Sequence, residues 1–138
     1  MLKTQVLVVD NEELYCQTIR ESLTPCGIDV SVAPEAASAG VLLRLLKPAV
    51  LIIDIRMKGM DGMETVRRLR QQPKWSGVPV IVASTFLLKT DQEAAIQAGA
   101  DAYLSKPFSA KELKLVLRRF IDLPKTGSLG AQGSLAAA

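Results

Sequence analysis

The chain has 138 residues, of which 49% are hydrophobic and 22% are charged, and its formal net charge is +3. This length suits one domain, and the composition excludes an intrinsically disordered chain. The chain contains no histidine, which excludes a Ser-His-Asp triad, an HExxH zinc site and an imidazole general base. Any chemistry must therefore use carboxylates, hydroxyls, lysines, thiols or groups that a partner supplies.

The sequence predicts neither a targeting signal nor a membrane span. The first ten residues lack the apolar run of a signal peptide, and no apolar run approaches the roughly 20 residues that cross a bilayer. Cys16 and Cys26 match no metal-binding spacing, and two free thiols suit a reducing compartment. We therefore expect a cytoplasmic protein that does not bind membranes.

The first part of the chain has the pattern strand, helix, strand, helix. Residues 6–9 form a continuous apolar run, which is typical of a strand buried on both faces. A helix is predicted at 11–25, because this segment opens with a capping asparagine and two glutamates. Residues 28–33 alternate between apolar and polar, which indicates an edge strand. A second helix is predicted at 34–46, with proline in its first turn.

The rest of the chain repeats this alternation three times. Gly99 is a helix-ending signal, and Ser109 with Glu112 forms a capping box at the start of the last helix. The predicted strands lie at 49–53, 78–83 and 102–104, and the predicted helices lie at 61–72, 90–98 and 109–122.

Five strand–helix units in succession predict an α/β fold. We expect a doubly wound, five-stranded parallel sheet, a (βα)5 arrangement, over residues 1–122. Residues 123–138 are rich in Gly, Ser and Ala, and we interpret them as a flexible linker or an appended tail.

Polar residues follow the predicted strands at the end where parallel sheets bind ligands. Asp10 follows the first strand, Asp54 the third, Ser84 the fourth and Lys106 the fifth. A carboxylate directly after a buried strand needs a partner or a metal ion, and oxygen-rich clusters suit Mg²⁺. An ion-paired loop cluster without a ligand is the alternative that these residue types leave open.

At these positions the chain resembles the receiver domain of response regulators, the phospho-acceptor module of two-component signalling, over about residues 2–122. Asp54 precedes Ser84 by 30 residues and Lys106 by 52. The resemblance rests on four motifs in order: Val-Leu-Val-Val-Asp10-Asn11-Glu12, Leu-Ile-Ile-Asp54 with Met57-x-x-Met60-Asp61-Gly62, Pro79-Val-Ile-Val-Ala-Ser84, and Ala-Asp-Ala-Tyr103-Leu-Ser-Lys106-Pro107-Phe108.

The resemblance implies a phosphorylation site and a metal site. Asp54 would take a phosphoryl group, as an acyl phosphate, from a histidine kinase or a histidine phosphotransfer protein. Mg²⁺ would be held by Asp10, Asn11, Asp54 and the backbone carbonyl of Arg56. Such a domain is a signalling switch and not an enzyme in its own right.

The resemblance also implies how the switch works. Lys106 and Ser84 would stabilise the phosphoryl group, and Ser84 would draw its loop inward. Tyr103 would then change rotamer and alter the surface formed by the fourth helix, the fifth strand and the fifth helix. A homodimer through this surface is consistent with the same resemblance.

Three positions depart from the family pattern. Asn11 replaces a second acidic residue, which predicts weaker Mg²⁺ binding unless Glu12 compensates. Lys58 replaces a proline in the loop after Asp54 and adds a cation there. Phe86, together with Arg56, stands where the family controls access of hydrolytic water, so the bulk of Phe86 predicts a longer-lived phosphorylated state.

These departures support an alternative, a pseudo-receiver that binds partners without phosphorylation. A haloacid-dehalogenase-type hydrolase is disfavoured because Arg56 stands where its second aspartate belongs. No glycine-rich dinucleotide motif follows the first strand. The modest charge and the lack of a DNA-binding motif argue against direct binding of nucleic acid.

Overall fold

The computed structural model describes residues 3–57, 61–85 and 88–123. The predictions about Lys58 and Phe86, and those about the segment after residue 123, lie outside the described residues. Within the described part of the chain, no helix is long and apolar enough to cross a membrane.

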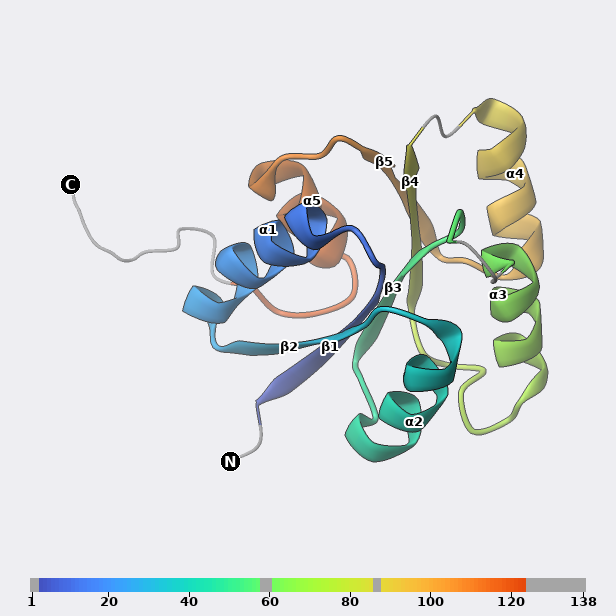
Figure 1. The fold of residues 1–138 in the computed structure, drawn as a ribbon, viewed down its shortest axis with the longest axis horizontal. Coiled ribbons are helices and arrows are strands. Elements are labelled where there is room, and N and C mark those ends of the chain that lie inside the picture. Colours follow the sequence, from blue (N-terminus) through green and yellow to red (C-terminus); the bar gives the residue numbers. More distant parts are fainter. Residues whose placement is uncertain (1–2, 58–60, 86–87, 124–138) are drawn as a thin grey trace.

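Five parallel strands form one sheet in the order β2-β1-β3-β4-β5 (Figure 1), which confirms the predicted (βα)5 fold. The strands are β1 (Thr4–Val9), β2 (Ile28–Ala33), β3 (Val50–Asp54), β4 (Val80–Thr85) and β5 (Ala102–Lys106). The helices are α1 (Glu13–Leu23), α2 (Ala36–Leu46), α3 (Gly62–Gln71), α4 (Lys89–Ala98) and α5 (Ala110–Leu117), with a short 3₁₀ turn at Thr24–Cys26.

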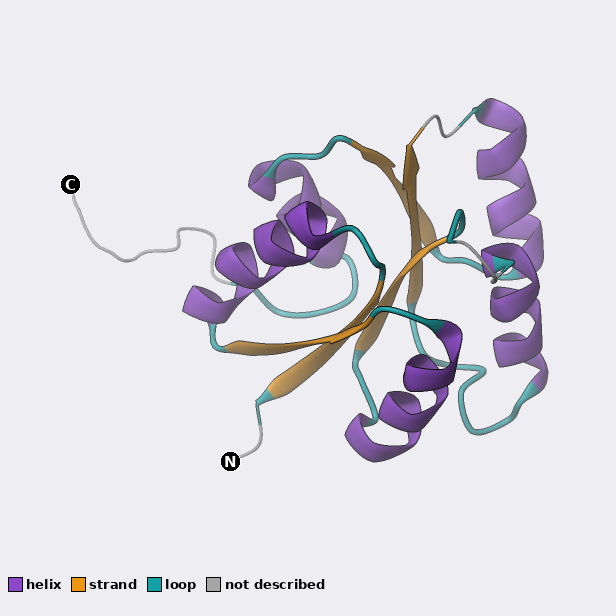
Figure 2. Ribbon diagram, viewed as in Figure 1, coloured by secondary structure: helices purple, strands orange, loops and turns teal. Residues whose placement is uncertain are grey.

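Helices cover both faces of the sheet, with α1 and α5 on one side and α2, α3 and α4 on the other (Figures 1 and 2). The strand β1 shows why its run of apolar residues is continuous. Val6 and Val8 belong to the core under α1 and α5, whereas Leu7 and Val9 belong to the core under the other three helices. Successive side chains of a strand point to opposite faces, so a strand between two helical layers has no polar side.

The edge strands differ from this pattern. The strand β2 pairs only with β1 and is partly solvated, as its alternating sequence predicts. At the other edge, β5 buries Ala102, Leu104 and Lys106 and exposes Tyr103 and Ser105. This alternation places the end of β5 in the interior and Tyr103 on the surface.

Caps are seen at three helices, and those of α4 and α5 confirm the sequence signals. Asp61 accepts a hydrogen bond from the backbone N–H of Glu64 at the start of α3, and Ser109 and Glu112 form the capping box of α5. Gly99 ends α4 with a positive φ of 114°, a conformation that glycine adopts without strain.

Most helix boundaries differ from the prediction by one or two residues, and two of the differences bear on the site and the core. The helix α1 begins at Glu13, so Asn11 lies in the β1–α1 loop and is not its cap. The helix α5 ends at Leu117, five residues earlier than predicted. Residues 118–121 continue in turns, in which Phe120 N–H bonds to the Leu117 carbonyl, and Phe120 and Ile121 still pack against the core. A helical apolar pattern therefore persists beyond the helix because these side chains are needed for packing.

Candidate functional site

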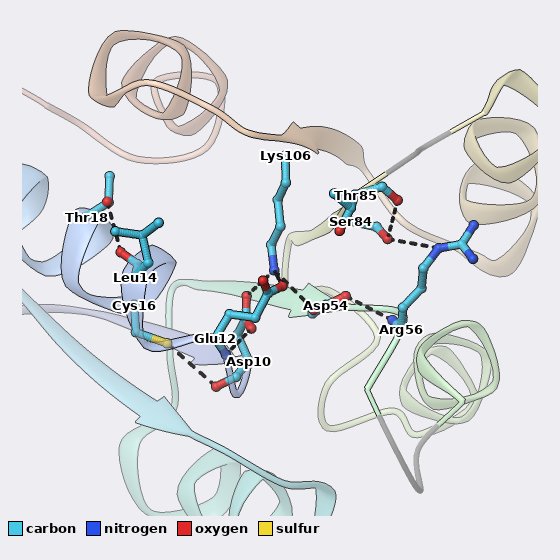
Figure 3. A network of polar contacts seen from close by, with 10 residues as sticks. All are labelled: Asp10, Glu12, Leu14, Cys16, Thr18, Asp54, Arg56, Ser84, Thr85 and Lys106. Atoms are coloured by element: carbon cyan, nitrogen blue, oxygen red, sulfur yellow. Dashed lines mark hydrogen bonds and ion pairs between the residues drawn. The ribbon is translucent and has the colours of Figure 1, made fainter.

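Three carboxylates and one lysine meet at the carboxyl ends of β1, β3 and β5 (Figure 3). Lys106 Nζ donates to Asp10 Oδ2 at 2.8 Å, to Glu12 Oε1 at 2.6 Å and to Asp54 Oδ2 at 3.1 Å. The sequence predicted that Asp10, Asp54 and Lys106 meet at this edge, and the structure brings them into direct contact.

The Lys106 ammonium has no exposed surface and uses all of its hydrogen-bonding capacity. The ring of Tyr15 covers it, with the centroid 4.6 Å from Nζ, and Tyr15 in turn packs on Phe108 at 5.2 Å between centroids. Burial by itself lowers the pKa of Lys106, but the hydrogen bonds to Asp10 and Glu12 outweigh this and raise the pKa overall. Lys106 is therefore a fixed cation at neutral pH.

The two buried aspartates are held in the same way. Asp10 Oδ1 accepts the backbone N–H of Glu12 at 2.8 Å, and Asp54 Oδ1 accepts that of Arg56 at 2.9 Å. In each aspartate one oxygen is thus fixed by the backbone two residues later, and the other oxygen faces Lys106. Burial raises the pKa of Asp10 and outweighs the hydrogen bonds from Lys106 and Glu12, which lower it.

The cluster carries more negative than positive charge. Asp10, Glu12 and Asp54 each offer an oxygen within 4.8 Å of the others, whereas one ammonium faces all three. Oxygen donors at this spacing fit Mg²⁺, which prefers carboxylates and water. The Glu12 side chain is 46% exposed, so it lies at the solvent side of the cluster and the two aspartates lie at its base.

Asn11 is placed differently from its neighbour Glu12. It is exposed and lines a hollow of about 160 Å³ that it shares with Asp10 of the cluster and with Glu13 and Arg20. Glu12, not Asn11, hydrogen-bonds to the buried lysine. The reason is the backbone of the β1–α1 loop, in which Glu12 N–H turns back onto Asp10.

Ser84 is fully buried at the end of β4, next to Asp54 on β3 (Figure 3). Its hydroxyl accepts a hydrogen bond from Arg56 Nε at 3.1 Å and donates to the Thr85 carbonyl at 3.1 Å. Arg56 also forms an ion pair with Asp91 at 3.0 Å. The sequence pointed to Arg56 as a metal ligand through its carbonyl and as a residue that affects access of water, and it did not predict these contacts of the side chain with Ser84 and Asp91.

Tyr103 lies outside the cluster, on the surface between α4 and α5. Its side chain separates two hollows, one of about 400 Å³ toward Lys89 and Ile96 of α4 and one of about 350 Å³ toward Leu115 of α5. The residue is 40% exposed. This position agrees with the surface on which the sequence placed the switch.

The family model of the response regulator receiver domain matches residues 6–118. The chain belongs to this family. The receiver domain is 42% identical over 116 residues to the KDP operon transcriptional regulatory protein KdpE of Escherichia coli, covering 83% of this chain and 50% of KdpE. It is 32% identical over 120 residues to an uncharacterized 14.6 kDa protein of Leptolyngbya boryana, covering 87% of this chain and 92% of that protein.

Solved structures agree with this assignment. The chemotaxis protein CheY4 of Vibrio cholerae superposes with a TM-score of 0.80 at 26% identity, over 87% of this receiver domain and all of CheY4. The receiver domain of the sensor histidine kinase PA1611 of Pseudomonas aeruginosa, solved with a magnesium ion in its active site cleft, gives 0.76 at 27% identity over 86% and 98% of the two chains. The resemblance read from the sequence is thus confirmed at the level of family and fold.

Two residues of the site carried no signal in the sequence. Tyr15 is three residues after Glu12, and its contact with Lys106 follows from the path of α1. Asp91 is 35 residues after Arg56 and belongs to no motif of the family pattern. The contacts of Tyr15 with Lys106 and of Asp91 with Arg56 depend on the packing of helices against the strand ends. The spacing of residues along the sequence does not specify this packing.

Proposed function

We propose that this receiver domain accepts a phosphoryl group on Asp54 in the presence of Mg²⁺ and then changes its α4–β5–α5 surface. The observation that carries the proposal is the contact of one buried lysine with both buried aspartates, Asp10 and Asp54. Burying two carboxylates costs several kcal/mol each unless they are compensated. A fold has little structural reason to keep an excess of such groups at one edge, whereas phosphoryl transfer needs them.

The chemistry is nucleophilic displacement at phosphorus. The Asp54 carboxylate forms a bond to phosphorus while the bond from phosphorus to a histidine nitrogen of the donor breaks, and the leaving imidazole takes up a proton. Because this chain contains no histidine, the imidazole belongs to the partner, a histidine kinase or a histidine phosphotransfer protein. The domain is a switch and not an enzyme with turnover of its own.

Asp10, Glu12 and Asp54 would hold the metal ion. Bound Mg²⁺ supplies positive charge that offsets the repulsion between the Asp54 carboxylate and the incoming phosphoryl oxygens. Glu12 provides the second acidic side chain that Asn11 lacks, since Glu12 shares the cluster with the two aspartates. Metal ligation by Asn11 and by the Arg56 carbonyl stays a prediction.

Lys106 and Ser84 act after transfer. Lys106 exchanges its contact with Asp54 Oδ2 for one with a phosphoryl oxygen, and Ser84 gives up the Thr85 carbonyl to donate to another. Tyr103 responds on the surface between the two hollows, where a homodimer or a downstream target would bind. The boundary at residue 122 and a cytoplasmic location stay predictions from the sequence.

The curated relatives leave the output open. The chain spans about half the length of KdpE and of the MprA response regulator of Mycobacterium bovis. A transcriptional output, which the name of KdpE carries, is therefore a proposal for a longer protein and not for the residues described.

The test is intact-mass spectrometry after incubation with acetyl phosphate and Mg²⁺. We expect the wild-type chain to gain one phosphoryl group and Asp54→Asn, which keeps the size of the side chain, to gain none. Asp29→Asn, an equivalent change on the edge strand β2, should leave phosphorylation unchanged. Trp75 is a poor optical reporter because it lies near Lys47 and Pro48, before the amino end of β3 and far along the strand from Asp54.

Absence of a mass increase at saturating Mg²⁺ would contradict this proposal and favour the pseudo-receiver. That alternative predicts partner binding that Asp54→Asn does not change.

A further inference from the structure

Three side chains connect the phosphorylation site to the first turn of α4. Arg56 Nε donates to Ser84 Oγ at 3.1 Å, and Arg56 Nη2 contacts Asp91 Oδ2 at 3.0 Å. The same Asp91 oxygen accepts the backbone N–H of Leu88 at 3.1 Å, at the residue before α4 begins. A continuous path of polar contacts therefore runs from β4 through the β3–α3 loop to α4.

This path fixes the hydroxyl of Ser84 in one orientation. With Arg56 donating to its oxygen, Ser84 directs its own hydrogen to the Thr85 carbonyl. The hydroxyl is fully buried, so water does not compete for these contacts. In the described residues Ser84 makes no hydrogen bond to Asp54, although the two residues lie on adjacent strands.

Arg56 also hydrogen-bonds to Asp54, the proposed phosphoryl acceptor. Its backbone N–H bonds to Asp54 Oδ1 at 2.9 Å, while its side chain extends toward Ser84 (Figure 3). A phosphoryl group on Asp54 would add anionic oxygens close to this guanidinium. They would compete with Asp91 for it, because a guanidinium binds phosphate oxygens strongly.

We propose that Asp91 is a positioning residue for phosphoryl acceptance: it holds the Arg56 guanidinium on Ser84, and so keeps Ser84 and the first turn of α4 in the resting arrangement. This inference rests on the proposed function. Phosphorylation then breaks the Arg56–Asp91 pair, which frees Ser84 for the phosphoryl group and releases α4 in the same step. The energy that holds the resting state is small, since the Arg56 side chain is 51% exposed.

The experiment measures the affinity of beryllofluoride, a phosphoryl mimic, with saturating Mg²⁺. Asp91→Asn keeps an oxygen for the Leu88 N–H but removes the charge that holds Arg56, and we expect it to bind about two- to fivefold more tightly than wild type, the range for a half-exposed ion pair. Asp91→Glu keeps the charge and should return the affinity to the wild-type value.

Glu93→Gln is the matched control, because it removes the same charge from α4 at an exposed position with no ion pair to a described residue. It should leave the affinity unchanged. Sodium chloride near 1 M should shrink the difference between Asp91→Asn and wild type, because salt screens exposed pairs. A second readout is exchange of the Arg56 Nε hydrogen by NMR, which should quicken in Asp91→Asn and not in Glu93→Gln.

Equal affinities of Asp91→Asn and wild type, or weaker binding by the variant, would overturn the role of Asp91 and leave the proposed function standing. If the wild-type chain itself fails to bind beryllofluoride with Mg²⁺, the proposed function fails, and the inference fails with it.

Discussion

Two cations lie at opposite ends of the sheet and differ in what surrounds them: the side chain of Lys106 is fully buried, and that of Arg70 is 19% exposed. Lys106, at the carboxyl ends of the strands, contacts three carboxylates. Arg70, at the end of α3, reaches the segments before β4 and β5, where it donates to the carbonyls of Gly99 and Val78, both at 2.7 Å, and to the carboxylate of Asp101 at 2.7 Å.

The partners determine what each cation can do. Arg70 bonds mostly to neutral backbone carbonyls, so moving it would remove several hydrogen bonds at once. Lys106 faces an excess of negative charge, so a metal cation could replace its ammonium beside the carboxylates, and a phosphoryl oxygen could replace a carboxylate as its acceptor. We therefore call Arg70 with its acceptors the permanent joint, because its contacts hold two loops together. We call Lys106 the exchangeable cation, because its contacts can be replaced.

The largest expected effect comes from removing the exchangeable cation. Lys106→Met should lower the free energy of unfolding by about 3 kcal/mol, because it leaves buried carboxylates without their counter-charge. Addition of Mg²⁺ should recover much of this loss, since a divalent cation replaces the ammonium. Urea unfolding with and without Mg²⁺ measures both values, and a loss that Mg²⁺ does not recover would show that the carboxylates do not form a metal site.

Arg70→Lys tests the permanent joint. Lysine keeps the charge but loses the planar set of donors, so we expect a cost of about 2 kcal/mol in the free energy of unfolding. Here Mg²⁺ should have no specific effect, and Asp54 should be phosphorylated by acetyl phosphate at the wild-type rate. A change in that rate would mean that the two ends of the sheet are coupled.

Asp10→Asn should change the free energy of unfolding by less than the two previous variants, and it should raise this free energy where they lower it. Since the folded-state pKa of Asp10 is raised by burial, the folded protein binds this proton more tightly than the unfolded chain. The contribution of Asp10 to stability is therefore greatest at acid pH and is lost as the pH rises through the folded pKa. We expect Asp10→Asn to be about 1 kcal/mol more stable than wild type at neutral pH.

The gain of Asp10→Asn should diminish as the pH is lowered toward 4. Thermal unfolding of both proteins across this range checks the trend, with Asp29→Asn as the control at an exposed site. A gain that is constant with pH would show that titration of Asp10 does not contribute.

The sequence predicted the fold and the convergence of Asp10, Asp54 and Lys106 for a physical reason. Residues that follow buried parallel strands must meet at one edge, whatever the loops do. The sequence left open whether Glu12 compensates for Asn11, because the direction of the Glu12 side chain depends on the path of the β1–α1 loop, in which Glu12 contacts Lys106. The side chain of Arg56 reaches across to β4 and α4, and no local pattern specifies that reach.

Tyr103 gives the surface a movable partition. Its ring lines the hollows of about 400 and 350 Å³ on its two sides, which are separate. In the proposed switch, an inward turn of the ring would remove this partition and join the two hollows across β5. A single side-chain torsion would then decide whether a partner meets two short hollows or one longer one.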